Sequence, residues 1–165
     1  MRPRRGSAVP DETPNGLPAV RLMVDGETVS LPIASDTSLL RALRAAGHMS
    51  VPGGCEQGEC GTCTVRIDGR TVCSCLVPAA LCEGADIATV RSVVAADLAD
   101  ALVAHGAVQC GFCTPGFVVS AAAALDAAGP PLSDDEVRER LAGNLCRCTG
   151  YEGIVAAVLA TDRAR

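Results

Sequence analysis

Residues 54–65 read GCEQGECGTCTV and place three cysteines in one glycine-rich loop that runs into a predicted strand. With a fourth cysteine farther along, Cys55, Cys60, Cys63 and Cys75 follow the spacing C-x4-C-x2-C-x11-C. Three thiolates from one tight loop and a fourth from a later segment is the plant-type arrangement for a [2Fe–2S] cluster. The spacing therefore predicts one such cluster here.

The glycines of this loop fit the same chemistry. A four-thiolate cluster carries negative charge and gains more on reduction, so backbone N–H groups must face its sulfurs. Gly54, Gly58 and Gly61 allow the unusual backbone angles that such a wrapped loop needs. A structural zinc site is the alternative, but zinc sites usually combine two C-x2-C pairs. One loop that supplies three ligands favours the cluster.

Two hairpins flank the cysteine loop. Asp25-Gly26 and Asp68-Gly69 each separate two short apolar runs, which is a strong signal for a two-residue β-turn. Capping oxygens at 36–38 precede apolar residues at helical spacing, and Gly47 ends that helix. The predicted elements are strands at 20–24, 27–31, 64–67 and 70–73 and a helix at 39–46. Two hairpins with one crossing helix predict a β-grasp sheet.

From about residue 95 the pattern becomes helical. Pro115 stands at the first position of one predicted helix, and Ser133 with Glu136 forms a capping box before another. The predicted helices cover 97–103, 115–128, 137–141 and a last segment from 152. We predict an α+β chain with a β-grasp domain at 18–93 and an all-α four-helix domain at 94–165. Residues 1–17 are expected to be a disordered tail because they offer too little apolar surface to fold.

A second cysteine set lies in the helical half. Cys110-x2-Cys113 and Cys146-x-Cys148 each occupy a loop that enters a predicted helix. Amides at the N-termini of these helices can face an anionic cluster. The spacing alone leaves both a second [2Fe–2S] cluster and a zinc site open.

Three sequence strings carry a family resemblance: GCEQGECGTCTV at 54–65, QCGFCTPG at 109–116 and GNLCRCTGY at 143–151. Together with SCL at 74–76 they closely resemble the small iron–sulfur subunit of the molybdenum hydroxylases. This family includes xanthine dehydrogenase, aldehyde oxidase and aerobic carbon monoxide dehydrogenase. The resemblance covers about residues 20–159, and it implies a ferredoxin-like β-grasp domain followed by a four-helix domain.

The resemblance also implies roles for individual residues. Cys110, Cys113, Cys146 and Cys148 would bind the cluster nearer molybdenum, and the first set would bind the cluster nearer a flavin. In the family, the glutamine that matches Gln109 reaches the molybdopterin held by a large subunit. The cysteine that matches Cys148 lies close to that pterin.

The implied function is that of an electron relay without catalytic residues of its own. Electrons would pass from a molybdopterin centre on a large subunit, through both [2Fe–2S] clusters, to FAD on a medium subunit, within a dimer of heterotrimers. The rival is a free-standing two-cluster carrier or redox sensor, although a simple ferredoxin does not need the second domain. The substrate is not specified by this chain, because the substrate pocket of such enzymes lies on another subunit.

Two cysteines, Cys73 and Cys75, are candidates for the fourth ligand of the first set. The two side chains would share one face if the strand stayed regular, so periodicity does not separate them. The family resemblance favours Cys75, because its eleven-residue gap from Cys63 and the string at 74–76 both match. Cys82 fits no ligand spacing and is expected to pack as a small apolar residue.

Bulk properties exclude several classes of protein. The formal net charge is −5, which does not favour a nucleic-acid partner. The longest apolar run, 117–128, is broken by Ser120 and Asp126 and is too short to span a bilayer. No apolar stretch follows the N-terminal arginines, as a secretory signal would require. We therefore expect a soluble cytoplasmic chain, in which ten cysteines indicate metal binding rather than disulfides.

Overall fold

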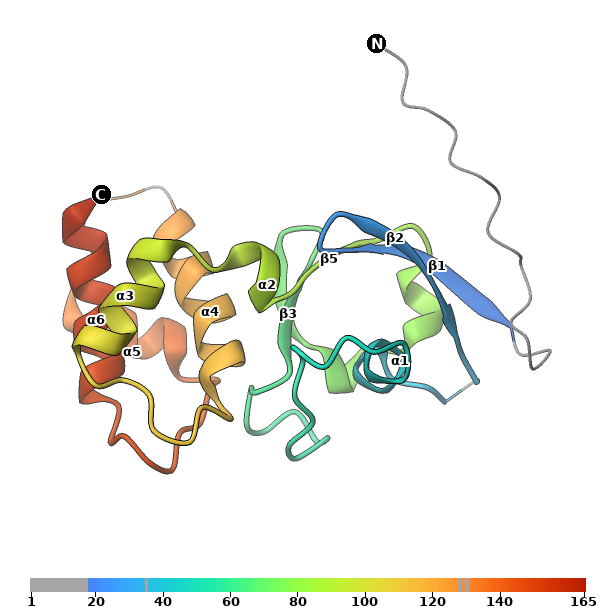
Figure 1. Cartoon of the computed structure of the whole chain (residues 1–165), viewed down its shortest axis with the longest axis horizontal. Helices are drawn as coiled ribbons and strands as arrows, with labels where there is room; N and C mark the ends of the chain where they lie inside the picture. Colours follow the sequence, from blue (N-terminus) through green and yellow to red (C-terminus); the bar gives the residue numbers. More distant parts are fainter. Residues whose placement is uncertain (1–17, 35, 128, 130) are drawn as a thin grey trace, which may run out of the picture.

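The computed structural model describes residues 18–34, 36–127, 129 and 131–165. A sheet domain and a helical domain follow one another along the long axis of the molecule, and α4 of the second lies against β3 of the first (Figure 1). The predicted α+β class is confirmed. The predicted tail at 1–17 lies outside the described residues.

The first domain is a five-stranded mixed sheet with the strand order β2-β1-β5-β3-β4. Both predicted hairpins are confirmed, as β1 with β2 and β3 with β4. The strands are β1 (Ala19–Val24), β2 (Glu27–Pro32), β3 (Thr64–Ile67), β4 (Arg70–Cys73) and β5 (Asp86–Ala88). At both turns the Asp and the Gly have positive φ, as type I′ turns require.

The central strand β5 was missed by the sequence reasoning. It pairs in parallel with β1 and antiparallel with β3, so it joins the two hairpins into one sheet. Its middle residue, Ile87, is fully buried. Three residues are too few for an alternating pattern to reveal a strand, and their pairing depends on hairpins distant in sequence.

The predicted helix after the first hairpin is α1 (Leu39–Ala45). The Ser38 hydroxyl caps it by accepting a hydrogen bond from the Arg41 N–H at 3.3 Å. Leu39, Leu40 and Leu43 are buried against the sheet and form its core with the strand residues. Gly47, with φ +91°, ends the helical segment as predicted.

The second domain contains the four predicted helices. They are α3 (Ala96–Ala104), α4 (Thr114–Asp126), α5 (Asp134–Leu141) and α6 (Glu152–Ala164). The capping box of Ser133 and Glu136 forms with both of its hydrogen bonds. Position 128, where α4 was expected to end, lies outside the described residues.

A separate apolar core holds these helices together. The Phe117 and Tyr151 rings meet edge to face with their centroids 6.2 Å apart, so both aromatic residues contribute to packing. A short additional helix, α2 (Val90–Val93), connects the sheet to this bundle, and Val90 and Val93 pack against the helical core. The exact domain boundary near residue 93 stays a prediction. Within the described ranges, no helix combines the length and apolarity needed to cross a membrane.

Candidate metal centres

The first cysteine loop directs backbone amides at a thiol. The Sγ of Cys55 accepts hydrogen bonds from the N–H groups of Gln57, Glu59 and Cys60, each at 3.4 Å. Positive φ angles at Glu56 (+54°) and Gly58 (+80°) wrap the loop in this way. The amides, with Gln57 contributing most, lower the pKa of Cys55 to about 6. The loop therefore stabilises the Cys55 thiolate through its own backbone amides.

The four thiols of the first set meet in two pairs. Cys55 contacts Cys60, and Cys63 contacts Cys75. Burial, followed by the contact with Cys63, raises the pKa of Cys75 to about 12. In a [2Fe–2S] cluster with four cysteines, each iron takes two thiolates. Each of the two thiol pairs fits the donor set of one iron.

The choice between Cys73 and Cys75 depends on the end of β4. The strand does not continue through both cysteines, because it ends at Cys73 and a 3₁₀ helix, η1 (Ser74–Leu76), begins. Cys73 and Cys75 would share one face of the sheet only in a regular strand, and the strand does not extend to Cys75. Cys73 lies opposite Thr64 across the hairpin and contacts its hydroxyl, whereas Cys75 contacts Cys63 and the Gly58 N–H. This placement supports Cys75 as the fourth ligand.

Ser74 shapes this turn and was missed as a site residue. It is fully buried, and its hydroxyl donates to the Cys63 carbonyl at 2.8 Å. The bond ties the segment that carries Cys75 to the loop that carries Cys63. Its sequence signal is the string at 74–76, in which Ser74 directly precedes Cys75. Cys82 is buried in the sheet core, as expected for a small apolar residue.

The second cysteine set also forms two pairs. The Sγ atoms of Cys110 and Cys148 lie 3.7 Å apart, and Cys113 contacts Cys146. Cys146 is buried, but Cys110 and Cys148 are exposed. The set therefore extends from the helical core to the surface. All ten cysteines of the chain are free thiols, which leaves these eight available to metal.

Side-chain and backbone donors surround Cys146. Burial acts to raise its pKa, but the Thr149 hydroxyl, which donates to the Cys146 Sγ at 3.1 Å, and the N–H groups of Cys148 and Thr149 lower it to about 7. Burial, then the contact with Cys146, raises the pKa of Cys113 to about 12. Thr149 was not singled out from the sequence, although it stands inside the string at 143–151.

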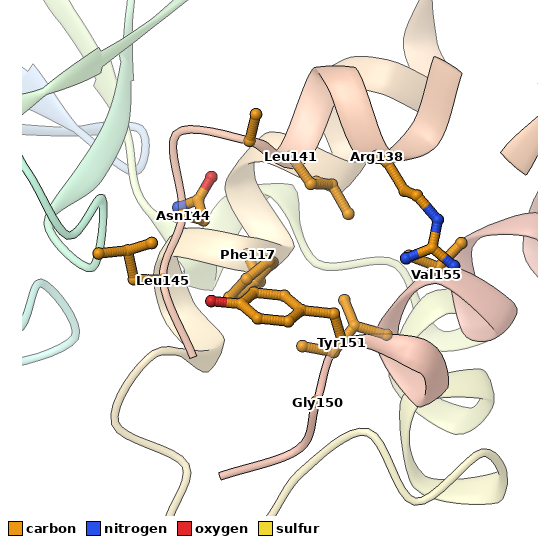
Figure 2. A pocket seen from close by; sticks show the side chains of 10 residues that line it. Phe117, Arg138, Leu141, Asn144, Leu145, Gly150, Tyr151 and Val155 are labelled. Carbon is orange, nitrogen blue, oxygen red and sulfur yellow. The ribbon is translucent and has the colours of Figure 1, made fainter. Parts of the chain in front are cut away.

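Tyr151 fixes the backbone at the same site. Its hydroxyl accepts a hydrogen bond from the Cys146 N–H at 3.0 Å, and its own φ of +71° turns the chain into α6. Figure 2 shows its ring beside Phe117, lining a pocket with a volume of about 270 Å³ beside the cysteine loop. The predicted entry of each cysteine pair into a helix is confirmed, because α4 follows Cys113 and α6 follows Tyr151.

Gln109 lies on the exposed side of this site. Its Nε2 donates to the Cys148 carbonyl at 3.1 Å, which joins the loop before α4 to the loop before α6. The side chain therefore has a partner within the chain. Contact of Gln109 and Cys148 with a molybdopterin stays a prediction.

The paired geometry bears on the choice between iron and zinc. A zinc site gathers four thiolates around one ion. Thiols in contacting pairs match the two thiolates that each iron of a [2Fe–2S] cluster takes. The assignment of the individual ligands stays a prediction, with Cys55, Cys60, Cys63 and Cys75 for one cluster and Cys110, Cys113, Cys146 and Cys148 for the other.

Comparison with known proteins agrees with this division. Residues 22–96 match the family described as "2Fe-2S iron-sulfur cluster binding domain", and residues 86–159 match "[2Fe-2S] binding domain". The xanthine dehydrogenase iron-sulfur-binding subunit of Escherichia coli O157:H7 is 42% identical over 153 residues, which cover 88% of this chain and 95% of that protein.

Solved structures show the same architecture. Quinoline 2-oxidoreductase from Pseudomonas putida 86 superposes with a TM-score of 0.81 at 38% identity, covering 90% of this chain and 95% of that one. The aldehyde oxidoreductase from Desulfovibrio desulfuricans superposes with a TM-score of 0.82 at 38% identity, and there the match covers 88% of this chain but 17% of a much longer one. With its two [2Fe–2S]-binding domains in the same order, this chain belongs to the small iron–sulfur subunits of the molybdenum hydroxylases.

Proposed function

We propose that this chain relays single electrons from a molybdopterin centre on a large partner subunit to FAD on a medium partner subunit. The helical-domain set would receive the electron first and the β-grasp set second, within a dimer of heterotrimers. When bound, each cluster supplies one-electron redox chemistry. The chain's own residues hold the clusters and orient the two sites, and none of them acts as acid, base or nucleophile.

The observation that carries this proposal is the exposure of one thiol pair. Cys110 and Cys148 lie at the surface of the helical domain, whereas Cys113 and Cys146 lie deeper. A site that opens on one side suits electron exchange with a cofactor on another subunit. Gln109, joined to Cys148 by its hydrogen bond, stands on that same exposed side.

Purification under native conditions tests the proposal against a free-standing carrier. We expect a tag on the chain, expressed from its own host, to recover two larger chains together with molybdenum and FAD. Recovery of the chain alone, fully loaded with iron and able to exchange electrons in isolation, would instead support the free-standing carrier or sensor.

Gln109 offers a sharper test of the molybdenum side. We expect Gln109→Ala to keep both clusters and to lower turnover or molybdopterin content in the assembled enzyme. If the side chain serves only to join its two loops through the Cys148 carbonyl, the variant loses thermal stability and keeps its cofactor content and turnover. The two outcomes separate a contact across the interface from a local one.

A further inference from the structure

The two cysteine loops contact each other directly at the junction between the domains. The Cys60 carbonyl accepts a hydrogen bond from the Leu145 N–H at 3.0 Å. Leu145 immediately precedes Cys146, so one hydrogen bond joins a cysteine of the first set to the residue beside a cysteine of the second. A second hydrogen bond lies nearby, in which the Thr62 hydroxyl donates to the Phe112 carbonyl at 2.7 Å.

Asn144 lies next to this hydrogen bond and bridges three segments. Its Nδ2 donates to the Gly61 carbonyl at 2.9 Å, and its Oδ1 accepts from the Ser120 hydroxyl of α4 at 2.7 Å. Only 4% of the residue is exposed. Figure 2 shows Asn144 on the side of the pocket that faces the β-grasp domain. A buried side-chain amide whose NH₂ group and carbonyl oxygen are both hydrogen-bonded holds its partners in one geometry.

Glycines let the two domains approach to backbone contact here. A Cβ at Gly116 would lie 2.2 Å from the Gly61 carbonyl oxygen, and a Cβ at Gly61 would lie 2.1 Å from the Gly143 carbonyl oxygen. Neither position tolerates a methyl group without a shift of backbone. The separation of the two loops is therefore fixed by this glycine contact and by the Asn144 amide.

We propose that Asn144 is a positioning residue for electron transfer between the two clusters, an inference that rests on the proposed relay function. Its amide holds loop 143–148 on loop 60–62 and so preserves the hydrogen bond between Cys60 and Leu145. In the step that it supports, a cluster held by the helical-domain cysteines would lose one electron and a cluster held by the β-grasp cysteines would gain it. Asn144 itself exchanges neither proton nor electron. Electron tunnelling slows steeply with distance, so a small separation of the loops has a large effect on the rate.

The test uses the full chain carrying both clusters. In the doubly reduced chain, the two paramagnetic centres split each other's electron paramagnetic resonance signals, and a pulse of a one-electron reductant gives the rate of transfer between them. We expect Asn144→Leu, which keeps the size of the side chain and removes its hydrogen bonds, to retain iron and sulfide, to reduce the splitting and to slow the transfer.

Thr161→Val is the matched control for the loss of a buried hydrogen bond. Thr161 is 2% exposed, and its hydroxyl donates to the Ala157 carbonyl within α6. We expect this control to show the splitting and the transfer rate of the unmodified chain. Unchanged splitting and rate in an Asn144→Leu chain with full iron content would overturn the positioning role.

A second pair of variants tests the junction without removing a polar group. Gly116→Ala places a methyl group against the Gly61 carbonyl, whereas a Cβ at Gly143 meets nothing within 4 Å. We expect Gly116→Ala to reduce the splitting and Gly143→Ala to leave it unchanged, and equal splitting in both would contradict the proposal. These measurements need no partner subunit, so a negative result would contradict the positioning role of Asn144 without contradicting the proposed relay. Conversely, recovery of the chain without partners would contradict the relay and would not affect these measurements.

Discussion

The two cysteine sites differ in how much of the chain builds them. Three cysteines of the first site come from one loop at 55–63, and the fourth follows the adjoining hairpin. The second site takes one pair of cysteines from the loop before α4 and one from the loop before α6. The first geometry is thus largely local, whereas the second exists only after two helices distant in sequence have packed together.

The sites also differ in how they stabilise negative charge. At the first site, three backbone N–H groups of one loop converge on the Cys55 sulfur. At the second, the Thr149 hydroxyl approaches the Cys146 sulfur and the Tyr151 hydroxyl holds the Cys146 backbone. Negative charge at the first site is therefore stabilised mainly by the conformation of one loop. At the second site, individual side chains contribute more of this stabilisation.

The largest effect is expected when the first site loses Cys75, the ligand that lies farthest along the chain from its cysteine loop. We expect Cys75→Ser to abolish the first cluster and leave the second intact, because a hydroxyl replaces a thiolate beside Cys63. The bound cluster contributes to folding, so the thermal midpoint of the sheet domain falls as well. Iron content and the spectrum of the reduced chain measure both effects.

Cys73→Ser is the control for this prediction. Cys73 lies near Cys63 but ends β4 opposite Thr64, so we expect the spectrum of the reduced first cluster to stay nearly unchanged. Loss of the cluster in Cys73→Ser together with its survival in Cys75→Ser would reverse the assignment.

The contrast between the sites also explains what the sequence could predict. Both hairpins, the helix behind Ser38 and the capping box at Ser133 follow local rules, and the structure confirms each of them. The spacing of the first cysteine set predicts its cluster, whereas the spacing of the second leaves a zinc site open and only the family resemblance favours a second cluster. Thr149 and Tyr151 had no local signal of their role, because it depends on how the loop folds onto Cys146.

Strand β5 and Asn144 were missed for the same physical reason. β5 is a strand only because β1 and β3 pair with its two edges. Asn144 meets Gly61 across a sequence separation of 83 residues. Contacts between segments this far apart leave no periodicity in either segment, so patterns along the chain do not indicate them.

A smaller effect distinguishes the glycines of the two sites. Gly58 and Gly150 both have positive φ, which costs a non-glycine residue about 1–2 kcal/mol. A Cβ at Gly58 would also lie 2.4 Å from the Leu76 Cδ1 and 3.0 Å from its Cγ, so this exposed side chain has to move, whereas a Cβ at Gly150 meets nothing within 4 Å. We expect Gly58→Ala to lower the thermal midpoint and speed cluster loss more than Gly150→Ala. Equal effects would show that the first loop is not the more constrained of the two.

The smallest effect concerns the reduction potential of the second cluster. A hydroxyl donor stabilises the more negative reduced state, so Thr149→Val should lower the potential, and Thr149→Ser should retain it. One hydrogen bond contributes about 1 kcal/mol, which corresponds to a shift of about 40 mV for one electron. Redox titration followed by paramagnetic resonance measures the shift, with the first cluster as internal reference. A shift of the first cluster alone would contradict the assignment of Thr149 to the second.

Metal and sulfide analysis of the purified chain tests the central claim most directly, because both sites are inferred to hold the same kind of cluster despite their different construction. Two complete four-cysteine sets predict about four iron and about four acid-labile sulfide atoms per chain, with negligible zinc. About two iron atoms per chain, alone or accompanied by about one zinc, would contradict the assignment of a [2Fe–2S] cluster to the helical domain.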